Sequence, residues 1–222
     1  MAISVRTTRT WRSCGWATVA RRVALLLAAL AVTACATAPA PPASTPLLSP
    51  ATSIEAAGMV DVRALVPDLS QDIRYFGSDN FVGAPVDGYL APRCWLKREA
   101  AQALARVEAS LRLRNQRLRV YDCYRPARAV AHFMRWVEDP NDVATKARFY
   151  PELDMGTEFD FFGPRANTDS PLATDAQRRN RHALRDAMAA EGFHNYAMEW
   201  WHYTFRPEPS PGILYDVPIT EP

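Results

Sequence analysis

The first 50 residues of this 222-residue chain confine any folded domain to the part that follows them. Five arginines precede an apolar run of ten residues, Val23–Val32, and residues 36–50 hold five prolines among alanine, serine and threonine. Ten residues are too few for a helix to cross a bilayer about 30 Å thick, and an apolar run after basic residues is typical of an export signal. The proline-rich stretch has little to bury and favours an extended tether. We therefore expect one domain that begins near residue 55.

The end of the apolar run, Val32-Thr33-Ala34-Cys35, resembles the lipobox of bacterial lipoproteins. In that class the cysteine is diacylated and becomes the new N-terminus. The resemblance implies a signal peptide over 1–34, a lipidated Cys35 with a tether over 35–54, and a domain over 55–222 on the periplasmic side of a membrane. An ordinary cleaved signal, which would release a soluble periplasmic protein, is the alternative.

The charge balance argues against a nucleic-acid partner. The formal net charge is +2. Without the five arginines of residues 1–34, which we call the leader, the chain has 21 basic and 24 acidic side chains. Nucleic-acid binding needs a basic face that displaces counterions from phosphates. We expect the lipid anchor to be the chain's only contact with a membrane.

Periodic apolar residues predict three helices in the domain. The first covers Lys97–Arg114, the second follows Pro126 with Ala129, Val130, Phe133 and Val137 on one face, and the third covers Thr174–Glu191. Short strands are expected within Met59–Val66, Asp72–Phe76, Leu118–Tyr121 and Ala197–Phe205. This mixed order indicates an α+β fold, with a small mixed or antiparallel sheet flanked by helices.

Two cysteines, Cys94 and Cys123, lie in the part of the chain that export would carry across the membrane. Exported proteins retain disulfides, so we predict that the two residues pair; two buried thiols are the alternative.

Glu199 and His202 stand three positions apart in an aromatic segment that we expect to be a strand. A metal-dependent hydrolase needs an imidazole ligand and a carboxylate that takes a proton from water. By itself the pair fits a glutamate and a histidine with structural roles better than a metal site.

Several further motifs resemble the D-alanyl-D-alanine dipeptidases, the zinc enzymes of vancomycin-resistance type. They are, in chain order, Val120–Pro126, Ala129–Phe133, Asp154–Asp160, Gly192–Phe193 and Glu199–His202. The resemblance extends from about residue 59 to 217 and implies hydrolysis of D-Ala-D-Ala in cell-wall peptide metabolism.

The resemblance also implies roles for three residues. Glu199 would be the general base and later the acid, His202 a ligand of one zinc ion, and Arg125 the cation that faces the oxyanion of the tetrahedral intermediate. A structural ion pair with Asp122 is the alternative for Arg125. Asp160 belongs to a segment near the substrate cleft of the family, but no chemical role follows for it.

The family takes its other two zinc ligands from a Ser-x-His-x-x-Gly-x-x-x-Asp stretch that is absent here. About two dozen residues are missing near 151–153, and residues 146–154 contain no histidine. His132 and Asp139 have the spacing of the missing ligands, but seven residues of a helix span about 10.5 Å, too far for one ion. His182 and His194 lie on a charged helix and after a turn, which makes them no better candidates.

This departure leaves two classes of function open and predicts weak zinc binding with little hydrolysis. The first is a zinc dipeptidase, with a related D,D-carboxypeptidase or endopeptidase as its variant. The second is a non-catalytic lipoprotein that binds peptidoglycan-derived peptides.

Overall fold

The computed structural model describes residues 2–7, 46–138 and 155–222. Cys35, Asp139 and Asp154 lie outside the described residues, and so do the remainder of the leader and the missing stretch near 151–153. Within the described part, no helix combines the length and the apolar character that a membrane span requires.

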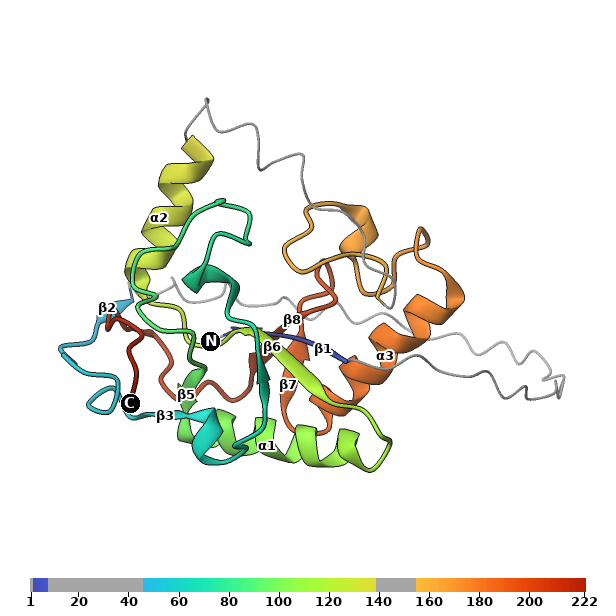
Figure 1. Ribbon diagram of the computed structural model, residues 1–222, viewed down its shortest axis with the longest axis horizontal. Coiled ribbons are helices and arrows are strands. Elements are labelled where there is room, and N and C mark those ends of the chain that lie inside the picture. Colours follow the sequence, from blue (N-terminus) through green and yellow to red (C-terminus); the bar gives the residue numbers. More distant parts are fainter. Residues whose placement is uncertain (1, 8–45, 139–154) are drawn as a thin grey trace, which may run out of the picture.

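The described elements form the expected α+β domain, with three helices and small sheets (Figure 1). The helices are α1 (Arg98–Arg112), α2 (Ala127–Glu138) and α3 (Asp175–Ala189). The strands are β1 (Ala2–Thr7), β2 (Leu47–Leu48), β3 (Met59–Asp61), β4 (Ser70–Gln71), β5 (Trp95–Lys97), β6 (Leu118–Asp122), β7 (Phe193–Asn195), β8 (His202–Phe205) and β9 (Ile213–Leu214).

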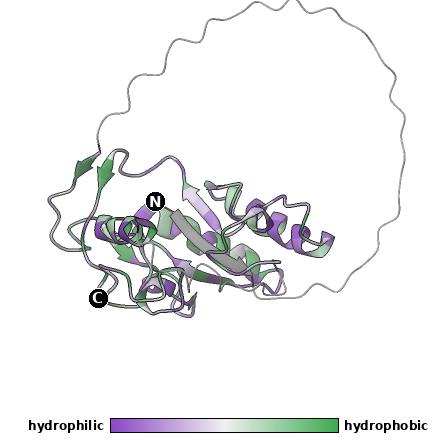
Figure 2. Cartoon of the chain, turned by 90° about the horizontal axis from the view of Figure 1, so that it is seen from above, coloured by the Kyte–Doolittle hydropathy of each residue, from purple (hydrophilic) through white to green (hydrophobic). Residues whose placement is uncertain are grey.

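The main sheet has five strands in the order β4-β6-β1-β8-β7. β4 and β6 are parallel, whereas β1 runs antiparallel to both β6 and β8, and β7 is antiparallel to β8. Two smaller sheets pair β3 with β5 and β2 with β9; the β2–β9 pair is hydrophobic in Figure 2.

The position of β1 was not expected from the sequence. The leader was predicted to stand apart from the domain, but Ala2–Thr7 form the middle strand of the main sheet. Composition predicts an export signal for these residues, whereas strand pairing depends on which backbone edges are available in the folded domain.

The core lies between the main sheet and the pair α1 and α3, which contact each other (Figure 1). Leu104, Val107 and Leu111 of α1 and Leu184 and Met188 of α3 are almost completely buried. These are the inward positions of two amphipathic helices, so periodicity alone located them. Thr174 begins α3 with a capping box.

The buried face of α2 differs from the prediction. Ala129 is buried and Phe133 packs against the core, but Val130 and Val137 are 48% and 57% exposed. Spacing gives the direction of a side chain on a helix, but how much of the helix is covered depends on the neighbouring elements.

Candidate active site

Glu199 and His202 form a direct pair at the entry to β8. The Oε2 atom of Glu199 lies 2.8 Å from Nδ1 of His202, and the two side chains are 25% and 27% exposed. Water can therefore reach a carboxylate that is hydrogen-bonded to an imidazole.

The prediction that Glu199 lies in a strand is wrong. Glu199 lies in a turn, and only His202 begins the strand. The side-chain amide of Asn195 donates to the carbonyl oxygens of both residues at 3.0 Å, which satisfies backbone acceptors that a sheet ladder would otherwise use. Trp200 and Trp201, whose aromatic character suggested the strand, are buried in the core.

Arg125 lies just beyond the end of β6 and is held by Asp122. Its Nε and Nη2 atoms donate to Oδ2 of Asp122 at 3.0 and 2.6 Å. The other oxygen, Oδ1, accepts from the Tyr89 hydroxyl at 2.7 Å and from the Cys123 amide at 2.9 Å. Burial by itself would lower the pKa of Arg125, but the charge of Asp122 and its hydrogen bonds, together with Tyr75 and Tyr89, outweigh burial and raise that pKa well above its usual range. The arginine is thus a fixed, permanent cation.

Asp160 is a site residue for which the sequence suggested no role. It is 7% exposed, has a left-handed φ of 61°, and accepts a 2.8 Å hydrogen bond from the Tyr75 hydroxyl. Burial raises its pKa to about 8, and the negative charges of Glu199 and Asp122 act in the same direction. The only signal in the sequence was its place at the end of the Asp154–Asp160 motif.

Tyr75 connects Asp160 with Arg125. The guanidinium of Arg125 lies 5.1 Å from the centre of the Tyr75 ring, whose hydroxyl reaches Asp160. Asp160 in turn interacts electrostatically with both Arg125 and Glu199. The structure therefore brings the Arg125 half and the Glu199–His202 half of the predicted site around one buried carboxyl group.

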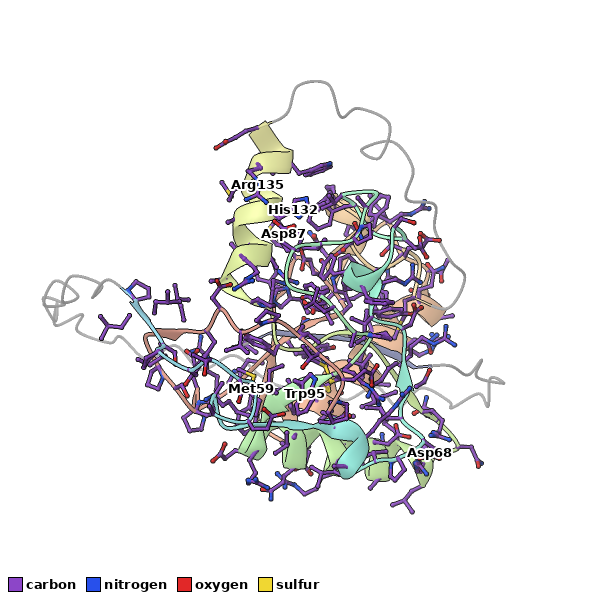
Figure 3. The ribbon with its side chains drawn as sticks, turned by 60° about the vertical axis from the view of Figure 1, so that its left-hand side comes forward. Met59, Asp68, Asp87, Trp95, His132 and Arg135 are labelled. Atoms are coloured by element: carbon purple, nitrogen blue, oxygen red, sulfur yellow. A yellow bond between two sulfur atoms is a disulfide. The ribbon has the colours of Figure 1, made fainter. Side chains whose placement is uncertain are left out.

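Three further histidines lie apart from this group. His132 lies on α2, and its Nδ1 atom accepts a 3.1 Å hydrogen bond from the backbone amide of Asp87. Arg135, on the same helix, forms an ion pair with the Asp87 side chain (Figure 3). His182 pairs with Asp169 at 2.5 Å, and His194 is exposed on β7.

A catalytic zinc ion takes three protein ligands and keeps a position open to water. Within residues 2–7, 46–138 and 155–222, no three His, Cys, Asp or Glu side chains come close enough to hold a metal ion. The described donor set, with His202 bonded to Glu199, therefore does not fit a catalytic zinc site by itself.

A pocket of about 270 Å³ adjoins Arg125 on the side of α2 and β9. Lys97 and Arg125 bring positive charge to it, and Val130, Ile213 and Leu214 bring apolar surface. The Lys97 ammonium lies 2.8 Å from the Tyr215 hydroxyl. Asp122 and Glu208 also line the pocket, so its two positive charges are matched by two negative ones, and the lining suits a small ligand with polar groups of both charges and an apolar side chain.

Cys94 and Cys123 are joined by a disulfide with Cα atoms 5.2 Å apart. Cys123 directly follows Asp122, so the bridge connects the residue before β5 to the strand end that carries the site. This cross-link restrains the backbone that holds Arg125.

The sequence profile described as D-ala-D-ala dipeptidase matches residues 55–153 and 150–221. A D-alanyl-D-alanine dipeptidase of Streptomyces coelicolor is 35% identical over 194 positions, which cover 71% of this chain and 96% of the relative. A D-alanyl-D-alanine dipeptidase of Enterococcus faecium is 30% identical, and the match covers 73% of this chain and 98% of the relative. A D-alanyl-D-alanine dipeptidase of Escherichia coli is also 30% identical, and the match covers 71% of this chain and 90% of the relative. The two ranges that match the sequence profile contain every residue that was placed in the site above.

Proposed function

Because the chain belongs to the D-alanyl-D-alanine dipeptidase family, we propose that it binds the D-Ala-D-Ala dipeptide and hydrolyses its peptide bond. The observation that carries the proposal is the Glu199–His202 pair, 2.8 Å apart and open to solvent, coupled through Asp160 to the fixed cation Arg125. Peptide hydrolysis is accelerated by a base that takes a proton from the attacking water and by a cation that faces the developing oxyanion.

Glu199 takes the proton of the attacking water. The neighbouring His202 ring holds the carboxylate in place, and the same proton then passes to the amine that leaves. Arg125 stabilises the negative charge that develops on the carbonyl oxygen, because Asp122 fixes its guanidinium before the substrate arrives.

The family uses zinc, and His202 is the ligand that this chain would provide. Since the described donors do not make a three-ligand site, the remaining ligands would have to come from residues outside the described part. No step of the reaction above is therefore assigned to the metal.

A second candidate is a binder of D-Ala-D-Ala peptides that does not cleave them. It is favoured by the observation that the described residues hold no group of three metal-binding side chains. Arg125 and the pocket beside it could hold a peptide carboxylate without any metal.

Three measurements on the purified full chain separate the candidates. They are the zinc content per chain, the binding of D-Ala-D-Ala, and the D-alanine released from this dipeptide. Release that Glu199→Gln abolishes, with dipeptide binding retained, supports hydrolysis. Binding without release supports the second candidate, and absence of both binding and release contradicts both.

We also propose that the protein is an exported lipoprotein anchored through Cys35. Its support is the lipobox-like sequence and the disulfide, which is typical of oxidising compartments. A diacylated cysteine provides the two chains that stable anchoring needs. Cys35→Ala should abolish labelling by radioactive palmitate and release the protein from membranes, whereas unchanged labelling would contradict the proposal.

A further inference from the structure

Six large apolar side chains on β2, β9 and α2 form a group that is about half exposed or more. Their exposed fractions lie between 48% and 68%, and they are Leu47, Leu48, Leu214, Val130, Met134 and Val137. Single exposed apolar residues are ordinary on a protein surface, but a contiguous group of them marks a surface that binds something. We call this group the apolar strip.

The three elements that carry the apolar strip are joined to one another. β2 pairs with β9, which places Leu48 beside Leu214. The amide of Ala127, at the start of α2, donates to the carbonyl oxygen of Tyr215, directly after β9, at 2.9 Å. Val130 and Leu214 line the same pocket, and Figure 1 shows β2 at the foot of α2. The strip is therefore continuous from β2 to α2.

α2 has apolar residues on two adjacent faces. Phe133 and Trp136 lie on the face that packs against the core. Val130, Met134 and Val137 follow one another at intervals of four and three residues, so they lie together on a second face about 10.5 Å long. A helix that packs only against its own domain needs one apolar face. The second face is available to another partner.

The tether determines which surface lies in front of the apolar strip. β2 begins at Leu47, 12 residues after Cys35. A flexible chain of this length has a root-mean-square end-to-end distance of about 20 Å, and a fully extended one reaches about 40 Å. A lipid on Cys35, as proposed above, would therefore hold β2 close to the bilayer. The strip lies on the part of the domain where the tether enters.

Two ion pairs flank the apolar strip on α2. Arg128 pairs with Asp216 at 2.9 Å, and Arg135 pairs with Asp87 at 2.6 Å. Each pair is neutral in sum, so these charges neither require anionic headgroups nor are repelled by them. What the strip offers to a bilayer is apolar contact, the interaction that holds an amphipathic helix at the boundary between headgroups and acyl chains.

We propose that the apolar strip is a docking face for the lipid bilayer, which its side chains enter at the boundary between headgroups and acyl chains. The inference rests on the proposed lipid anchor and adds a second membrane contact to the single one that the sequence predicted. Val130 and Leu214 belong both to the strip and to the pocket beside Arg125, so docking places that pocket close to the membrane surface. The inference holds whether or not the domain hydrolyses D-Ala-D-Ala.

The test uses the mature lipoprotein in phosphatidylcholine vesicles. An introduced cysteine is then the free thiol, since Cys35 carries the lipid and Cys94 and Cys123 form the disulfide. Met134→Cys, labelled with a fluorophore that responds to polarity, reports on the strip. Leu113→Cys is the matched control, because Leu113 is 89% exposed at the end of α1, on the side away from α2 (Figures 1 and 3).

We expect lipids with a nitroxide on the acyl chain to quench the label at position 134 and to leave the label at position 113 bright. Leu48→Asp, added to the Met134→Cys chain, places a charge in the strip while the lipid keeps the protein on the vesicles. It should lower the ratio of docked to undocked domains about tenfold, because a largely exposed leucine gains about that factor when it is buried. Leu113→Asp should leave the ratio unchanged.

The other outcomes each overturn the proposal in a distinguishable way. Equal brightness of the two labels, in a chain whose Cys35 carries lipid, would refute the docking face and leave the anchor intact. A chain without lipid on Cys35 would refute the anchor and the docking face together. A label at position 134 that is shielded but not quenched, and that becomes exposed when the vesicles hold at most one chain each, would show that a second copy covers the strip instead.

Discussion

Asp122 is the residue whose replacement should reveal most about how the site is held together. It is 1% exposed and accepts four hydrogen bonds, two from Arg125 at 2.6 and 3.0 Å and two from Tyr89 and Cys123. Asp122→Asn keeps the shape of the side chain but removes its charge. It also places an amide N–H group where only acceptors fit, so the two donors that face the replaced oxygen lose their partner.

The cost follows from the ion pair. Removing one partner of a buried pair costs about 3–5 kcal/mol, because the other charge stays buried without compensation. The side chain of Arg125 is 28% exposed, so solvent screens part of this penalty and the lower end, about 3 kcal/mol, applies. For a chain of this size such a loss lowers the melting temperature by about 6–12 °C.

Urea denaturation at pH 7, followed by tryptophan fluorescence, measures the effect. Asp68→Asn is the matched control, because Asp68 also pairs with two arginines, Arg112 and Arg117, but its side chain is 59% exposed. The control should unfold close to the unchanged protein. The double variant Asp122→Asn with Arg125→Met should recover part of the loss, since it removes the unpaired charge.

The reasoning would be refuted by an Asp122→Asn protein no less stable than the Asp68→Asn control. An additive double variant would show instead that the hydrogen bonds to Tyr89 and Cys123, rather than the pair with Arg125, stabilise this part of the fold.

Three further predictions concern other parts of the domain. Replacing both Cys94 and Cys123 by alanine opens a loop of 29 residues, which should cost about 3–4 kcal/mol in urea titrations; an unchanged midpoint would contradict this. Asp160 has its pKa raised from 3.8 to about 8, so its contribution to stability is present below pH 4 and is lost as the pH rises to about 8. Asp160→Asn should therefore gain stability over the unchanged protein across that range, by roughly 6 kcal/mol at most, and parallel melting curves against pH would disprove the assignment. Thr174→Ala removes the cap of α3 and should lower the free energy of unfolding by about 1 kcal/mol in a urea titration. Thr220→Ala, near the C-terminus, should lower it less.

The features that depend on neighbours along the chain could be predicted from the amino-acid sequence. α1 and α3 follow from apolar residues every three or four positions, and α3 begins at Thr174 because its side chain caps the first turn. The motifs around Arg125 and Glu199 identified the family, since their order and residue types were enough without any coordinates.

Contacts between residues far apart in the chain, in contrast, became visible only in the fold. Asp160 became a site residue because Tyr75, 85 positions away, donates to it in a buried place. Glu199 left the expected strand because Asn195 satisfies the turn that contains it. The middle strand of the main sheet comes from Ala2–Thr7, because pairing requires only a free backbone edge and an extended partner, and neither is encoded in local periodicity.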